Sequence, residues 1–157
     1  MQEKIASVDP KQIGQEMGKW FVQRVSAFRY LAWDEEKRIF SDKNPLDDCR
    51  ETNPAKFREE RMRYQVEKSV ALSILPFLAF IQAQSKDDRD DIIEDAFERK
   101  QEAIEQAMRG KGIPNVGGFP AAMGEHQIRK AITEHYLKYR VIFENAAIVI
   151  DKELKIS

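Results

Sequence analysis

Hydrophobic residues recur at helical spacing along four stretches of the chain. The first stretch begins after Asp9, a good N-cap, and Pro10, which follows at the first helical position, where its missing N–H costs nothing. Its apolar residues return every three or four positions, as one face of an α-helix requires: Ile13, Met17, Trp20, Phe21, Val25, Phe28 and Leu31. The pattern predicts a helix over about residues 9–33.

The longest stretch without a charge covers residues 69–84, and its apolar side chains point nearly all round a helical axis. A helix of this kind is covered by protein or by lipid. The run is shorter than the roughly 18–20 apolar residues of a membrane span and contains Pro76, so we expect no membrane span. It completes a second helix over residues 53–84, with Asn53 as N-cap, kinked or split at Pro76.

Two further helices follow. Ser85 is predicted to cap a third helix over residues 85–109, with acidic residues in its first turn and Gly110 as its C′ residue. A glycine-rich loop at residues 110–124 then leads to a fourth helix over residues 125–154. Two alternatives remain open for the second and third helices. A turn between them gives a compact bundle, whereas one continuous rod would need a partner chain to cover it.

Length and composition fit one soluble domain. The 157 residues are 34% charged with a formal net charge of −1, which argues against a generic nucleic-acid binder. Cys49 is the single cysteine, so no internal disulfide forms, and the N-terminus lacks a signal-peptide pattern. We therefore expect a cytoplasmic, all-α protein, with residues 1–157 forming a single antiparallel bundle of four main helices.

Candidate metal chemistry is confined to the acidic start of the third helix. The string DDRDD at residues 87–91 resembles the DDxxD motif with which isoprenoid synthases hold magnesium–diphosphate, and makes Asp87, Asp91 and Glu94 weak metal candidates. The chain looks much too short for such an enzyme, and acidic residues suit a first helical turn for dipole reasons alone. We expect no cofactor and no bound metal, and assign no catalytic residue.

Four polar residues share apolar helix faces and form a second candidate set: Arg24, Glu59, Lys100 and His135. Charges directed at a core must pair, titrate or reach water along the surface. Glu59 could pair with Arg24 or with Lys100, and a buried cluster of this kind can mark an active site. Structural ion pairs and long side chains at the bundle ends are the commoner explanation.

Several apolar residues fall outside the predicted core. The fourth helix carries a second apolar stripe opposite its core face, formed by Leu137, Val141 and Ile148. A surface helix needs only one stripe, so the second indicates sandwiching inside the chain or contact with another chain. The further candidates for partner contact are one aromatic residue near the end of the first helix and two residues of the loop: Trp33, Phe119 and Met123.

These features predict a non-enzymatic protein-interaction module. An adaptor, a secretion or assembly chaperone, or a small structural subunit of a larger complex would bind a helix or peptide in an apolar groove, and could form homo-oligomers. One alternative is a small metal-dependent hydrolase that uses the acidic face of residues 87–98. A third is a nucleic-acid-associated regulator, which ranks last because its basic residues are interleaved with acidic ones: Lys56, Arg58, Arg61 and Arg63.

Overall fold

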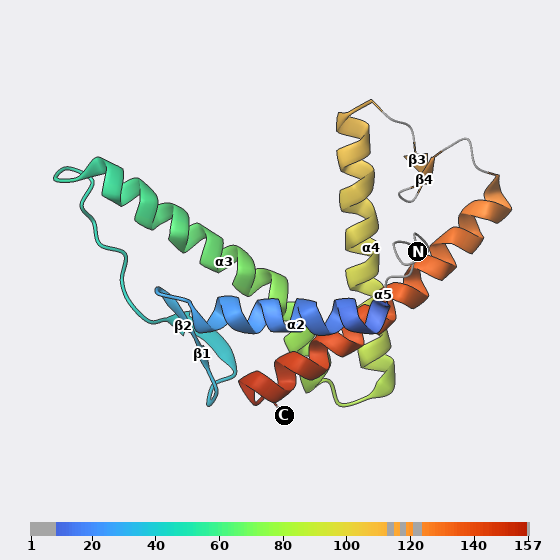
Figure 1. The fold of residues 1–157 in the computed structure, drawn as a ribbon, viewed down its shortest axis with the longest axis horizontal. Coiled ribbons are helices and arrows are strands. Elements are labelled where there is room, and N and C mark those ends of the chain that lie inside the picture. The colour runs from blue at the N-terminus through green and yellow to red at the C-terminus, as the bar shows by residue number, and fades with distance from the viewer. Residues whose placement is uncertain (1–8, 113–114, 117–118, 121–123, 157) are drawn as a thin grey trace, which may run out of the picture.

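Four helices make up most of the computed structural model, which describes residues 9–112, 115–116, 119–120 and 124–156 (Figure 1). Two short antiparallel hairpins accompany them. The elements in chain order are α2 (Pro10–Ser26), β1 (Leu31–Asp34), β2 (Ile39–Asp42), α3 (Pro54–Gln82), α4 (Lys86–Gly110), β3 (Asn115–Val116), β4 (Phe119–Pro120) and α5 (Glu125–Leu154). The predicted all-α class with four main helices is confirmed.

The helices begin where their capping residues predict. The side chains of Asp9, Asn53 and Ser85 each accept a hydrogen bond from a backbone N–H in the first turn of α2, α3 and α4. Such caps satisfy donors that have no partner inside the helix. At the other end of α4 the predicted C′ residue was two positions early, because Gly110 is still helical and the positive φ, 75°, falls at Gly112.

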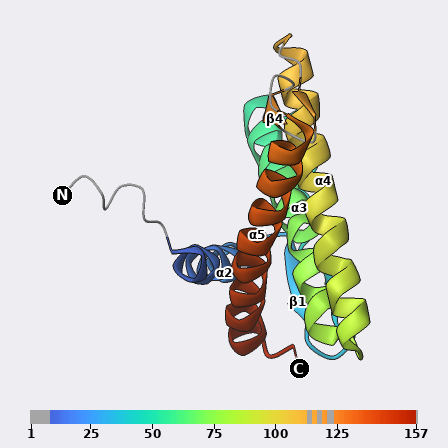
Figure 2. The ribbon, with the colours of Figure 1, turned by 90° about the vertical axis from the view of Figure 1, so that its right-hand side faces the viewer.

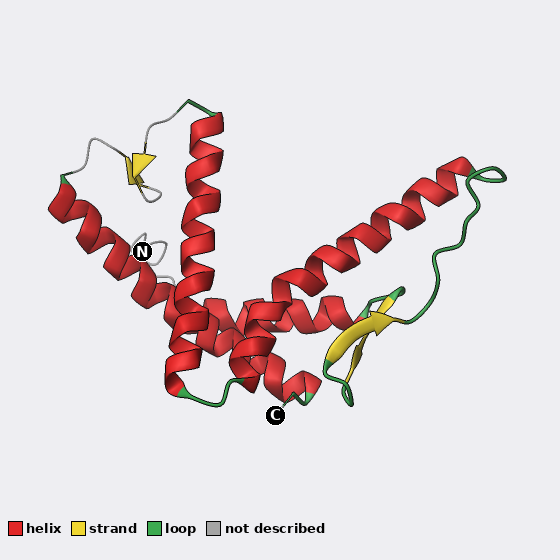
Figure 3. Cartoon of the chain, turned by 180° about the vertical axis from the view of Figure 1, so that it is seen from behind, coloured by secondary structure: helices red, strands yellow, loops and turns green. Residues whose placement is uncertain are grey.

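The first helix ends earlier than predicted. α2 stops at Ser26 rather than near Trp33, and residues 31–42 form the hairpin β1–β2 (Figure 3), in which Trp33 lies opposite Phe40. The helical spacing of apolar residues continues past Ser26 and misled the prediction. The chain leaves the helix because Glu67 of α3 binds the backbone N–H groups of residues 29–31, a contact that no local pattern reveals.

The second and third helices are separate. α3 runs without interruption through Pro76 to Gln82, and a turn at residues 83–85 leads into α4. This excludes both the split at Pro76 and the continuous rod. Seen from the side, α5 lies between α2 and the pair α3 and α4 (Figure 2). Phe77 of α3 stacks on Phe143 of α5 in the core, with ring centroids 4.3 Å apart.

Two glycines bring α2 into close contact with α5. A Cβ atom built on Gly18 would lie 2.7 Å from the Cβ of Val149 and 2.9 Å from the carbonyl oxygen of Ala146, and one built on Gly14 would overlap the carbonyl oxygen of Ile142. Only glycine permits this approach of one backbone to another. The contact fixes α2 across α5 and leaves Trp20 and Arg24 on the side that faces α3.

The ends of the helices spread apart from this crossing. The first half of α3 projects from one side of the molecule, and the second half of α4 projects with the first half of α5 from the other (Figure 1). The prediction that the apolar run of α3 is covered all round was therefore wrong, since Leu72 and Leu75 are 66% and 46% exposed. α3 is long and apolar enough to cross a membrane. Core helices of soluble proteins can have the same length and composition.

Candidate functional site: a groove between α2 and α3

An open groove runs between the end of α2 and the first half of α3. Phe28 and Val70 form its floor, each only 7% exposed. Trp20, Met62 and Val66 line its sides and are 44%, 70% and 57% exposed. Single exposed apolar side chains are ordinary on protein surfaces, whereas a contiguous patch of them marks an interaction site.

Charged side chains stand at the rim of this groove. The guanidinium carbon of Arg24 lies 5.2 Å from the centroid of the Trp20 ring. Arg63 forms an ion pair with Glu67 on its own helix, with Nε 3.5 Å from Oε2. In the part of the chain that the structure describes, neither Arg24 nor Glu59 forms an ion pair. These two charges are therefore free to meet charges of a partner.

One buried carboxylate fastens α3 to the end of α2. Glu67 is 4% exposed, and its oxygens accept hydrogen bonds from the backbone N–H groups of Arg29 at 2.9 Å, Tyr30 at 2.9 Å and Leu31 at 3.2 Å. These N–H groups lie where α2 has ended and β1 begins, so they lack partners in a helix. Glu67 replaces those partners and thereby sets the position of the groove's two sides.

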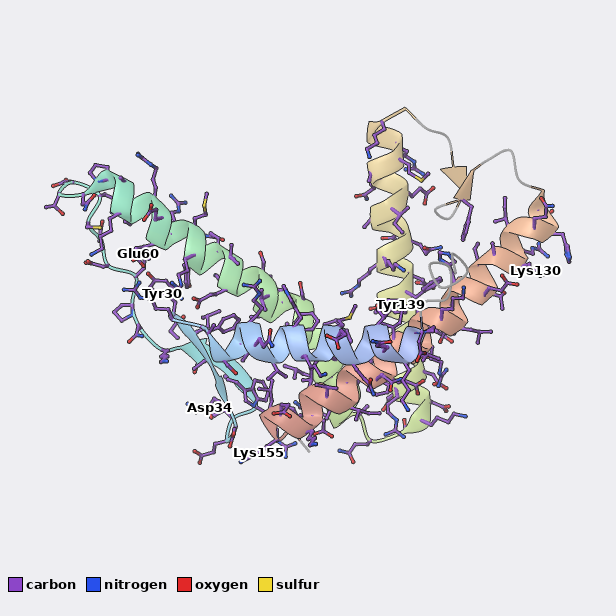
Figure 4. The ribbon with its side chains drawn as sticks, viewed as in Figure 1. Tyr30, Asp34, Glu60, Lys130, Tyr139 and Lys155 are labelled. Carbon is purple, nitrogen blue, oxygen red and sulfur yellow. The ribbon has the colours of Figure 1, made fainter. Side chains whose placement is uncertain are left out.

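Contacts farther along α3 support the same junction. Arg29 donates from Nη1 to Oε1 of Glu60 at 3.1 Å, and the rings of Tyr30 and Tyr64 meet edge to face at 5.8 Å. Figure 4 shows Glu60 and Tyr30 close together, between α3 and the hairpin. The first half of α3 is thus tied to the hairpin along two turns, although it projects from the body of the molecule.

The predicted polar cluster is not buried. All four of its members are exposed, and they fall in two places. Arg24 and Glu59 line the groove without forming an ion pair with each other. Lys100 lies over the ring of Tyr139, with Nζ 5.2 Å from its centroid, and His135 packs against an aromatic ring of β4. The prediction was wrong because helical spacing assigned the residues to core faces that the spread ends of the helices leave open.

Two of the predicted partner-contact residues, Trp33 and Phe119, lie in the hairpins. Trp33 is half-buried and meets the ring of Phe40 edge to face at 5.2 Å, so the second strand packs over it. Its indole N–H is buried and has no hydrogen-bond partner among the described residues. Phe119 is half-buried beside His135, and Met123 lies outside the described residues.

The second stripe of α5 is exposed. Leu137, Val141 and Ile148 are 56%, 38% and 65% exposed, so no described element of the chain sandwiches them. α2 packs on a neighbouring side of α5 instead, through residues 142, 145, 146 and 149. The stripe lines neither the groove described above nor the side of α3, so it supplies matched control positions for the experiments below.

The acidic residues of α4 lie on its surface. Asp87, Asp91 and Glu94 are exposed, and the described residues contain no group of three or more His, Cys, Asp or Glu side chains placed to hold a metal ion. Asp90, which was not among the metal candidates, accepts a hydrogen bond at 2.6 Å from Arg140 and joins α4 to α5. Asp90 thus forms an ion pair, and Asp87 lies in the first turn of α4, where the helix dipole favours a negative charge.

The residues whose pKa departs from its ordinary value lie away from the groove. The side-chain hydrogen bond with Asp90 is the main cause that raises the pKa of Arg140. Burial raises the pKa of Tyr139, which lies where α4 and α5 cross (Figure 4). At the surface, a side-chain hydrogen bond from Arg50 lowers the pKa of Asp48. Each shift accompanies a structural pair or the core, and none marks a catalytic group in the groove.

No protein-family model, curated protein or solved structure matches this chain. Its function is therefore inferred from the groove. Sequence reasoning missed this site because it placed Trp20 in the core. It also missed Glu67, for which a signal exists: this carboxylate shares one helical row with Ala71, Ile74 and Leu78, all of which are buried.

Proposed function

We propose that this protein is a non-enzymatic protein-interaction module that binds an amphipathic helix of another protein in the groove between α2 and α3. The observation that carries the proposal is the exposure of Trp20, Met62 and Val66, from two helices, over one buried apolar floor. A groove of this kind receives the apolar face of a helix, whose anchor residues recur at three- and four-residue spacing.

The rim charges indicate the pattern of the bound helix. A carboxylate beside its apolar stripe would meet Arg24, and a cation would meet Glu59, since both are free of ion pairs in the described structure. Charges at a rim mainly set the register and the association rate, whereas buried aromatic and aliphatic anchors supply most of the binding energy. Trp20 is the expected anchor on this side of the interface.

Selection of helical peptides tests the groove. A phage-displayed library of amphipathic helices, each with an apolar stripe and one flanking carboxylate, is selected against the folded protein. The sequence has two tryptophans, and Trp33→Phe leaves only Trp20, so that the fluorescence reports on the groove. We expect selected peptides to shift the Trp20 emission to the blue, and Met62→Asp with Val66→Asp to weaken their binding at least about tenfold.

The matched control is Leu137→Asp with Val141→Asp, which places the same charges on the other exposed apolar stripe. All four positions are exposed, so each pair should leave the unfolding free energy within about 1 kcal/mol of the parent protein, as a thermal melt would verify. Equal loss of peptide binding in both pairs, or selected peptides that tolerate the Met62 and Val66 changes, would contradict the proposed function.

A further inference from the structure

The outer face of α3 forms a second surface. We call it the outer seam and define it by seven exposed residues at alternating spacings of three and four: Arg58, Arg61, Gln65, Lys68, Leu72, Leu75 and Ala79. This spacing is that of the contact seam between two helices of a coiled coil. Its leucines lie on a different side of the helix from Met62 and Val66 and line a different groove, while Gln65 borders the groove that faces α2.

The apolar end of the outer seam continues onto α4. Leu72, Leu75 and Ala79 line an open groove together with Ile92 and Ala96, and Asp95 and Arg99, which pair with each other, border it on α4. Both leucines are exposed, yet they belong to the most apolar run of the sequence. Protein or lipid covers such a helix, and the described part of this chain leaves this side open.

We call the apolar residues of α3 and α4 that line this groove the apolar strip. Charges of opposite sign lie at its two ends. Arg61 and Lys68 continue the seam toward the start of α3, and both are exposed. Asp87, Asp88 and Asp91 lie at the start of α4, beside the end of α3, and are exposed too. Within the described ranges, none of these five residues takes part in an ion pair. The strip is therefore apolar in its middle, basic at one end and acidic at the other.

We infer that a second copy of this chain covers the strip, with the two α3 helices antiparallel about a two-fold axis near Leu72 and Leu75. A two-fold interface uses the same patch on both copies, so the patch must complement itself when turned end for end. The antiparallel arrangement places Arg61 and Lys68 of each copy along the acidic start of the other copy's α4. Parallel helices would place cation beside cation, which charge repulsion disfavours.

A lipid bilayer is the other cover for an apolar helix, and α3 is long and apolar enough to cross one. Insertion would have to remove α3 from the core, where Ile74 is fully buried and Phe77 stacks on Phe143. It would also have to break the three hydrogen bonds of Glu67 to the backbone. A second copy covers the strip without disturbing either, and membrane binding enters the experiment as the opposing outcome.

The solution mass across a concentration series tests this inference. Sedimentation or light scattering of the full chain should give twice the 18.3 kDa of one chain, with a dissociation constant that rises between about 50 mM and about 500 mM salt. Leu72→Glu with Leu75→Glu should weaken the dimer at least about a hundredfold, because it places four like charges in one interface. The matched control, Leu137→Glu with Val141→Glu, should stay dimeric.

A charge exchange tests the antiparallel arrangement. Lys68→Glu alone and Asp88→Lys alone should each weaken the dimer, and the double variant should recover part of the loss because each seam again meets an opposite charge. A monomer at every concentration, or a dimer that survives the Leu72 and Leu75 changes, would overturn the inference. Flotation of the wild-type chain with phosphatidylcholine vesicles, lost in the Leu72 and Leu75 variant, would overturn it in favour of a bilayer.

This inference and the proposed function can be tested independently of each other. The Leu72 and Leu75 variant should still bind peptides selected for the groove, because Met62 and Val66 line a different groove of α3. The Met62 and Val66 variant should in turn keep the mass of the dimer. A variant pair that abolishes both properties would show a single shared surface, and would contradict the assignment of two.

Discussion

Replacing Gly14 or Gly18 with alanine should destabilise the folded protein by about 1–3 kcal/mol each, because the added methyl group overpacks the crossing of α2 and α5. At Gly18 the new Cβ would lie 2.7 Å from the Cβ of Val149 and 2.9 Å from a backbone carbonyl oxygen. Neither neighbour can turn away as the end of a flexible side chain could. The two helices must move apart, and the contacts between them loosen along their whole length.

Helix propensity acts in the opposite direction and is smaller. Alanine is favoured over glycine in a helix interior by up to about 1 kcal/mol, which offsets part of the steric cost. The steric cost should prevail because both glycines are buried against α5. The double variant should lose more than either single one, although not by the exact sum, since both positions relieve strain through the same shift of α2.

Gly110→Ala is the matched control for these variants. Gly110 is the last residue of α4, and a Cβ atom built there meets nothing within 4 Å. Its replacement should be neutral or stabilising. In a protein of this size a change of 1 kcal/mol shifts the melting temperature by roughly 2–4 °C. If thermal melts give Gly14→Ala and Gly18→Ala the same melting temperature as Gly110→Ala, this result would contradict the close crossing of α2 and α5.

The parts of the fold that follow from local chemistry could be predicted from the sequence. Asp9, Asn53 and Ser85 cap helices where the prediction placed them, because a cap depends only on residues within one turn. The fourth helix was predicted with its bounds, since its apolar periodicity is long and uninterrupted. The all-α class and the number of helices follow from these signals.

The parts of the fold that depend on contacts between distant residues could not be predicted from the sequence. Glu67 binds N–H groups 36 to 38 residues earlier in the chain, and this contact replaces the predicted end of the first helix by a hairpin. Gly14 and Gly18 meet α5 more than 120 positions later. A periodic pattern indicates which face of a helix is apolar, but whether another element covers that face depends on how the helices cross. Trp20, Met62 and Val66 are exposed for this reason.

Glu67→Ala should be among the most destabilising single substitutions in this protein. It removes the acceptor of three backbone N–H groups at once, and those of Tyr30 and Leu31 belong to residues only 3% and 7% exposed. A buried donor left without a partner costs about 1–3 kcal/mol, so we expect a total of about 3–5 kcal/mol. Urea denaturation measures this loss, and Glu59→Ala, at an exposed carboxylate on the same helix, provides the control.

Glu67→Gln separates the hydrogen bonds from the size of the side chain. The amide keeps one oxygen but turns an NH₂ donor toward backbone donors, so at least one N–H must lose its partner. We expect a smaller loss, about 2 kcal/mol, concentrated at the junction of α2 and β1. Hydrogen exchange should accelerate among Arg29, Tyr30 and Leu31, whose N–H groups bind Glu67, while the amide of Phe143, in the core, keeps its protection. Unchanged exchange at the junction would contradict the role given to Glu67.

The same variant links this carboxylate to the proposed groove. Glu67 fixes the position of α3 relative to the end of α2, so its weakening should let Met62 and Val66 move with respect to Trp20. A groove that must be ordered during binding pays an entropic cost that a preorganised groove avoids. Peptides selected for the groove should therefore bind Glu67→Gln several-fold more weakly, mainly through faster dissociation. Equal affinity for the variant and the parent would show that the groove does not depend on this anchor.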